Sequence, residues 1–107
     1  MTHGIQPKDL KFIINTLINF PEVEKAFIFG SRALGNYKKG SDIDLAVMGG
    51  KVNLTTIAHI KTLLQEESPM PYLFDVIDYT HCKSEELKNH IDQFGLTIYT
   101  KAENSKQ

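Results

Sequence analysis

Apolar positions recur with helical spacing in three stretches of the chain. In residues 7–20 they fall at intervals of three and four, so we expect an amphipathic helix whose first turn contains Pro7 and which ends before Pro21. A second helix is predicted over 54–67 and a third over 84–94, with Ser84 as the N-cap of the third. The inward stripe of the second helix is expected to comprise Leu54, Ile57, Ala58, Lys61 and Leu64.

Shorter apolar runs predict strands at 24–29, 42–48 and 72–79, with a further short strand at 96–100. In the run 42–48, side chains alternate between two faces. One face carries Ile43, Leu45 and Val47, and the other carries Asp42, Asp44, Ala46 and Met48. The run 72–79 is apolar enough that we expect it to be a central strand. Helices and strands alternate along the chain, so we predict an α/β domain of two layers.

Length and composition fit a single soluble domain of 107 residues. Its core is expected over about residues 7–99, and 101–107 is expected to be a flexible tail. The net charge of −1 shows no overall attraction to nucleic acid, and no apolar run approaches the roughly 20 residues that a membrane span needs. With one cysteine, Cys82, the chain has no internal disulfide, which favours a reducing, cytoplasmic location.

The dipeptide Gly30-Ser31 ends the first apolar run and precedes a short predicted helix over 31–35. Backbone N–H groups at such a position can bind an anion, and glycine lets a phosphate approach the main chain. The alternative is a plain turn at Gly30 with Ser31 capping the helix. Taken alone, the dipeptide favours this alternative.

Three aspartates on predicted strands suggest a metal site. Asp42 and Asp44 lie two residues apart and share a face, a pairing that would suit Mg²⁺ but that, taken alone, favours a solvated strand start. Asp75 changes this balance, because a carboxylate between Phe74 and Val76 in a central strand needs a partner. Three carboxylates together would hold one or two Mg²⁺ ions for phosphoryl transfer.

A local basic cluster follows Ser31 and contains Arg32, Lys38 and Lys39. These side chains would neutralise a nucleoside triphosphate that binds beside the aspartates, although surface lysines are commonly just solvated. The four histidines and Cys82 lack zinc-site spacing, and the chain has neither a serine–histidine–acid signature nor a Walker-type GxxxxGK[ST] motif. The sequence therefore disfavours P-loop and serine-hydrolase chemistry.

Gly30-Ser31, ten intervening residues and Asp42-Ile43-Asp44 together resemble the GS-x10-DxD signature of the polymerase-β-like nucleotidyltransferase superfamily. The short chain and the later Asp75 make it similar to the minimal nucleotidyltransferases of that superfamily. The resemblance implies a small mixed sheet with helices packed mainly on one face. It also implies that Asp42, Asp44 and Asp75 bind Mg²⁺ and that Gly30 and Ser31 bind the nucleotide phosphates.

The activity implied by the resemblance is transfer of a nucleoside monophosphate, AMP from ATP, to an acceptor hydroxyl. The minimal members are encoded beside a helical HEPN-type partner, and an antitoxin of this type adenylylates that partner. A hetero-oligomer with such a protein is therefore expected, with a homodimer as the alternative when the chain is alone. A different class of function also fits: a non-catalytic module that binds nucleotide or partner and neutralises the partner by contact.

Overall fold

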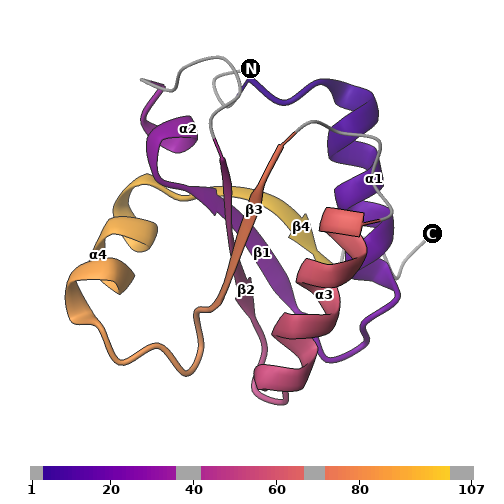
Figure 1. Ribbon diagram of the computed structural model, residues 1–107. Coiled ribbons are helices and arrows are strands. Elements are labelled where there is room, and N and C mark those ends of the chain that lie inside the picture. The colour runs from indigo at the N-terminus through magenta and orange to yellow at the C-terminus, as the bar shows by residue number, and fades with distance from the viewer. Residues whose placement is uncertain (1–3, 36–41, 67–71, 102–107) are drawn as a thin grey trace.

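The computed structural model describes residues 4–35, 42–66 and 72–101, and these residues form one four-stranded mixed sheet with four helices (Figure 1). The strand order is β3-β2-β1-β4; β1 is antiparallel to β2 and β4, and β2 is parallel to β3. The elements are α1 (Pro7–Ile18), β1 (Lys25–Phe29), α2 (Ser31–Leu34), β2 (Ile43–Met48), α3 (Leu54–Glu66), β3 (Phe74–Asp78), α4 (Glu85–Phe94) and β4 (Leu96–Thr100). The predicted fold class is confirmed. The expected loop 36–40, with Lys38 and Lys39, and most of the expected tail lie outside the described residues.

One face of the sheet carries the main hydrophobic core. The two long helices, α1 and α3, cover this face side by side (Figure 1). Ile43, Leu45 and Val47 of β2 are fully buried there, as their alternation in sequence predicted. They pack with Ile13 and Leu17 of α1. None of the helices in the described residues combines the length and apolar character that crossing a bilayer requires.

The predicted inward stripe of α3 is wrong at Leu54, Ala58 and Lys61, which are all exposed. Leu54 is 85% exposed, whereas Thr56, Ile60 and Leu64 are the buried residues of this helix. The reason is a polar anchor at the start of α3. The Thr56 hydroxyl donates to Glu22 Oε2 at 2.9 Å, and the Thr56 N–H donates to Asn53 Oδ1 at 3.0 Å. These bonds turn Thr56 inward. The spacing of apolar residues, on which the prediction rested, gives no sign of such bonds.

The other face of the sheet is covered in part by α4, which lies on the opposite side from α1 and α3 (Figure 1). Its N-cap is Ser84, as predicted, and the Ser84 hydroxyl accepts a hydrogen bond from the Leu87 N–H at 3.2 Å. Ile91 packs with Phe29 and Ala46 in a second, smaller cluster. Ala46 is completely buried, whereas Asp42, four residues earlier on the same face, is exposed. The start of β2 is therefore left open by α4.

The expectation that the third strand is central is wrong. Among the described residues, β3 pairs with β2 alone and forms an edge of the sheet. Asp75 is exposed, so it has no burial penalty for a partner to relieve. The strand is also shorter than predicted, because Tyr72 and Leu73 precede it. The position of Asp75 beside the other aspartates therefore has to be established from strand pairing.

Candidate active site

Strand pairing brings two of the predicted aspartates side by side. In the parallel register of β2 and β3, Asp44 is the partner of Asp75. The Ile43 N–H donates to the Leu73 carbonyl at 2.9 Å and fixes this register at the point where the two strands begin. Register partners on neighbouring strands point to the same face of a sheet. Asp42 lies two residues before Asp44, just outside β2, so all three aspartates lie at this open end of the sheet.

Gly30 lies directly against Asp44. Phe29, the last residue of β1, pairs with Asp44, and the chain then turns at Gly30 with φ 74°. A Cβ at Gly30 would collide with Asp44 Oδ2 and lie 3.2 Å from Asp44 Cγ. The left-handed φ and the close approach each require glycine at this position. The glycine thus lets the main chain pass within contact of the carboxylate.

The turn at Gly30 leads into α2, a single helical turn. The Gly30 carbonyl accepts hydrogen bonds from the N–H groups of Ala33 and Leu34, both at 3.1 Å. The N-cap is Gly30 itself, and no side chain caps this helix. The alternative that Ser31 serves as a helix cap is therefore wrong. Ser31 is instead the first residue of α2, and its side chain is partly exposed next to the turn.

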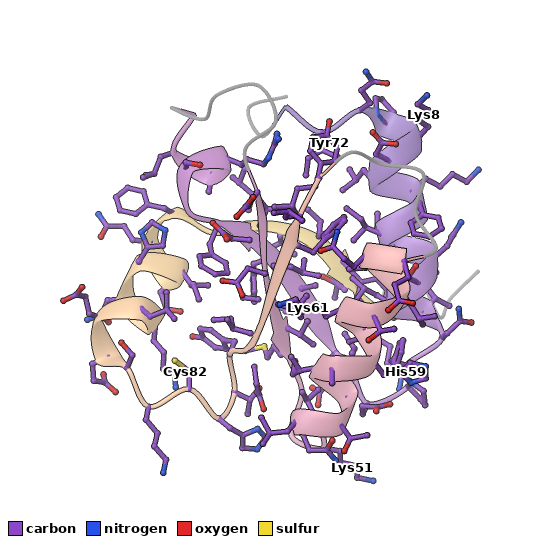
Figure 2. All side chains as sticks on the ribbon, in the orientation of Figure 1. Lys8, Lys51, His59, Lys61, Tyr72 and Cys82 are labelled. Atoms are coloured by element: carbon purple, nitrogen blue, oxygen red, sulfur yellow. The ribbon has the colours of Figure 1, made fainter. Side chains whose placement is uncertain are left out.

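Arg32 is 2% exposed, although the sequence predicted a nucleotide-binding role for it. Its guanidinium lies 4.8 Å from the centre of the Tyr72 ring, a cation–π contact. Tyr72 lies just before β3, at the end of the sheet where α2 is found (Figure 2). The contact ties α2 to the segment that leads to Asp75. Binding of nucleotide by Arg32 remains a prediction.

The three carboxylates repel one another, and Asp44 shows the effect. Its pKa is raised above the ordinary 3.8, first because burial disfavours the charged form and then because Asp75 and Asp42 add negative charge. Arg32 acts in the opposite direction and lowers it, as His90 would if it were protonated. Negative charge is therefore concentrated around Asp44, and a bound cation would offset the repulsion between the carboxylates.

We expect the Asp44→Asn variant, in buffer without divalent metal, to be more stable than the wild type at neutral pH. An aspartate whose folded-state pKa is raised destabilises the folded state once it is ionised. The gain should be modest, about 0.5 kcal/mol, because solvent screens a partly exposed group. Urea unfolding of both proteins from pH 7 to pH 4 measures it. The gain should shrink as the pH falls through the folded-state pKa of Asp44; a gain independent of pH would contradict this cause.

The carboxylates suit Mg²⁺, although they do not form a closed cage. In the described part of the chain, no three histidine, cysteine, aspartate or glutamate side chains already surround one metal position. Mg²⁺ is usually held by one or two carboxylates, with waters and substrate phosphates completing its shell. The pair Asp44 and Asp75, with Asp42 beside it, provides oxygen ligands of that kind.

His90 of α4 also belongs to this region, and the sequence did not indicate it. The Gly30 N–H donates to His90 Nε2 at 3.1 Å. The two residues are 60 positions apart, and His90 lies on a polar, partly exposed part of α4. A lone histidine in an amphipathic helix carries no spacing signal, so only the tertiary structure brings it to the turn.

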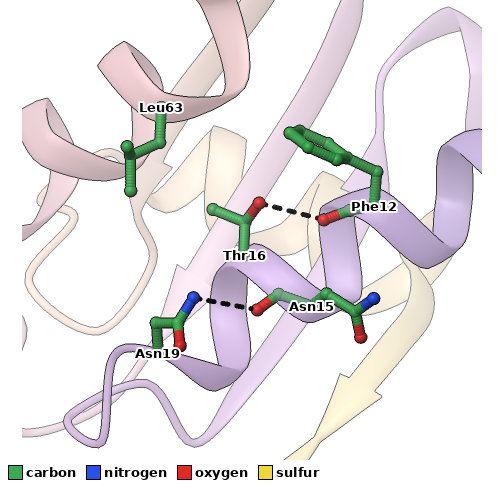
Figure 3. A pocket seen from close by; sticks show the side chains of 5 residues that line it. All are labelled: Phe12, Asn15, Thr16, Asn19 and Leu63. Atoms are coloured by element: carbon green, nitrogen blue, oxygen red, sulfur yellow. Dashed lines mark hydrogen bonds between the residues drawn. The ribbon is translucent and has the colours of Figure 1, made fainter. Parts of the chain in front are cut away.

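A pocket lies elsewhere, between α1 and α3 (Figure 3). Its volume is about 220 Å³, and it is lined by Phe12, Asn15, Thr16, Asn19 and Leu63. Thr16 and Asn19 direct their side chains to backbone carbonyls one turn earlier on α1. The lining has no ionisable side chain, and α1 and α3 are on the opposite face of the sheet from α4. The aspartates and Gly30 therefore define the candidate site.

Comparisons with known proteins show the family to which the chain belongs. The sequence model of the family described as "Polymerase beta, Nucleotidyltransferase" matches residues 11–104. A search of curated protein sequences gave no match. The chain is thus a member of the polymerase beta nucleotidyltransferase family, as the GS-x10-DxD resemblance predicted.

Solved structures similar to this chain share its fold. A chain of the toxin–antitoxin complex MntA-HepT is 19% identical, with a TM-score of 0.69 over 94% of this chain and 78% of that one. A toxin–antitoxin structure with AMP-PNP gives 17% identity and a TM-score of 0.70, over 95% of this chain and 79% of that one. A complex of tri-AMPylated HEPN toxin with MNT antitoxin from Shewanella oneidensis gives 18% identity and a TM-score of 0.68, over 95% of this chain and 78% of that one.

Proposed function

We propose that this protein is a Mg²⁺-dependent nucleotidyltransferase that transfers AMP from ATP to a hydroxyl group of a HEPN-type helical partner protein. The observation that supports it most is the register pairing of Asp44 with Asp75, next to a glycine turn that only glycine can make. The raised pKa of Asp44 adds a reason for a cation at this place. Membership of the family supports nucleotidyl transfer as the reaction type.

In this proposal the acceptor oxygen attacks the α-phosphorus of ATP, the bond to the bridging oxygen breaks, and pyrophosphate leaves. Bound Mg²⁺ would supply charge neutralisation at the transferred phosphoryl group and at the leaving group. Asp42 and Asp44 hold the metal. Asp75 is exposed beside Asp44, where it helps to hold the metal or orients the acceptor hydroxyl and takes its proton. The Gly30 turn and Ser31 bind the phosphates.

The similar structures support the proposed acceptor and nucleotide. Their complexes contain a HEPN toxin, AMP groups on that toxin, and AMP-PNP. We therefore expect ATP as the co-substrate and a hetero-oligomer with a HEPN-type protein encoded nearby. The single cysteine fits a reducing compartment, so we place the reaction in the cytoplasm.

Co-expression with the neighbouring open reading frame, followed by intact-mass measurement, tests this function. Wild-type protein is expected to add one or a few AMP units to the partner when Mg²⁺ and ATP are present, and none with EDTA. Asp42→Asn should abolish the addition, because it removes one metal ligand. Asp9→Asn, a matched change on α1 across the sheet, should leave it intact.

Two outcomes would contradict the proposal. If the AMP addition persists in Asp42→Asn, the chemistry is not carried by the carboxylates. If no AMP is added and the Asp42→Asn/Asp44→Asn variant still neutralises the partner's activity fully, the chain is a binding module that acts by contact.

A further inference from the structure

We propose that His90 is a positioning residue of this site, which holds the Gly30 turn in place for an incoming phosphate through the hydrogen bond that its Nε2 accepts. This inference rests on the proposed function and adds a residue on α4 to the three aspartates and the glycine turn. The observation that carries it is the bond from the Gly30 N–H to His90 Nε2, at 3.1 Å. Within the described residues, this bond joins α4 directly to the turn.

The bond matters because Gly30 has few other restraints. Its φ of 74° lies in a region where glycine moves freely, and glycine has no side chain to pack. Its carbonyl is held by the first turn of α2 through Ala33 and Leu34. Its N–H is held by His90. With both polar groups bonded, the peptide is fixed at the distance from Asp44 that the site requires.

The imidazole ring is itself held in place by aromatic neighbours. Its centroid lies 6.2 Å from that of Phe29 in an edge-on arrangement and 5.5 Å from that of Phe94. Phe29 is the residue before Gly30, so the ring packs on the same strand end that it hydrogen-bonds. To accept at Nε2, the ring must carry its proton on Nδ1 and be neutral. A lysine or arginine at this position would have no lone pair to offer.

The helix that presents His90 is anchored on the sheet. Ile91, the next residue, is 2% exposed in the second apolar cluster. The Tyr79 hydroxyl donates a short hydrogen bond to Asp92, and Lys88 lies 5.2 Å from the centre of the Tyr79 ring. At its C-terminal end, α4 passes through Gly95 directly into β4, which pairs with β1. The imidazole is therefore a rigid support for the turn.

Two substitutions separate hydrogen bonding from packing. His90→Gln keeps an acceptor oxygen at about the place of Nε2 but removes the ring. His90→Phe keeps a ring between Phe29 and Phe94 but removes the acceptor. If His90 acts through the hydrogen bond, glutamine retains function and phenylalanine loses it. If it acts through packing alone, the order is reversed. His59→Phe is the control, since His59 lies on α3, away from the turn (Figure 2).

Two measurements on each protein decide the matter. Amide hydrogen exchange of Gly30, followed by NMR, should speed up about five- to tenfold in His90→Phe and stay near wild type in His90→Gln, since one backbone hydrogen bond is lost. The Kd of a non-hydrolysable ATP analogue with Mg²⁺ should rise about fivefold in His90→Phe. His59→Phe should change neither value.

The outcomes distinguish this inference from the function on which it rests. A wild-type protein that does not bind the analogue overturns the proposed function and the positioning role together. Unchanged analogue binding in His90→Phe, when the wild type binds, overturns the role of His90 alone. So does weaker binding in His90→Gln than in His90→Phe, because it would assign the effect to ring packing.

Discussion

The Asp44→Asn variant is expected to transfer AMP at least about a thousandfold more slowly than the wild type, while its metal-free form becomes slightly more stable. Asp44 is the carboxylate at the centre of the site. It pairs with Asp75 across β2 and β3 and lies against Gly30. An amide at this position has nearly the same size but cannot offset the charge of Mg²⁺. The loss therefore comes from the chemistry, with the fold preserved.

Asp44→Asn is expected to lower the rate of AMP transfer and to raise the stability of the metal-free protein. A residue that serves only the fold would lose stability and activity together. Single-turnover rates on the isolated partner measure the first effect, and urea unfolding measures the second. Added Mg²⁺ should raise the melting temperature of the wild type and leave that of Asp44→Asn unchanged, because binding to the native state alone stabilises it. A variant that keeps more than about a tenth of the rate would exclude Asp44 as a metal ligand.

The faces of individual strands could be predicted from the sequence, because alternation is a local property. The face with Ile43, Leu45 and Val47 is buried as predicted, and the other face carries Asp42 and Asp44. The spacing from Gly30-Ser31 to the aspartates also identified the correct family. Both predictions depend on residues close together in the chain.

Features that depend on distant partners could not be predicted. An apolar run such as 72–79 suits a central or an edge strand equally, and pairing placed it at the edge. Thr56 turns inward because Glu22, 34 residues earlier, accepts its hydroxyl. His90 reaches the Gly30 turn across 60 residues. In each case the deciding hydrogen bond joins segments whose proximity exists only in the folded chain.

Gly30→Ala is expected to lower the stability of the protein by about 2–4 kcal/mol and to abolish transfer. Two costs add at this position. An alanine at φ 74° is strained, and its Cβ would overlap Asp44 Oδ2. To avoid the overlap, either the turn or the carboxylate must move, and both belong to the site. Urea unfolding and the AMP-transfer assay measure the two losses.

Gly35→Ala is the matched control for this prediction. Gly35 ends α2 with φ 83° and ψ 4°, a left-handed conformation that alanine tolerates better than the φ 74° and ψ −151° of Gly30, and a Cβ there meets no atom within 4 Å. It should cost only about 1–2 kcal/mol. The difference between the two variants then contains the overlap with Asp44 and the greater backbone strain at Gly30. Adding Asp44→Ala to Gly30→Ala removes the Oδ2 and Cγ atoms, so the double variant should recover the part of the difference that comes from the overlap. Strictly additive losses would show that Gly30 and Asp44 do not share one space, and the site described here would be wrong.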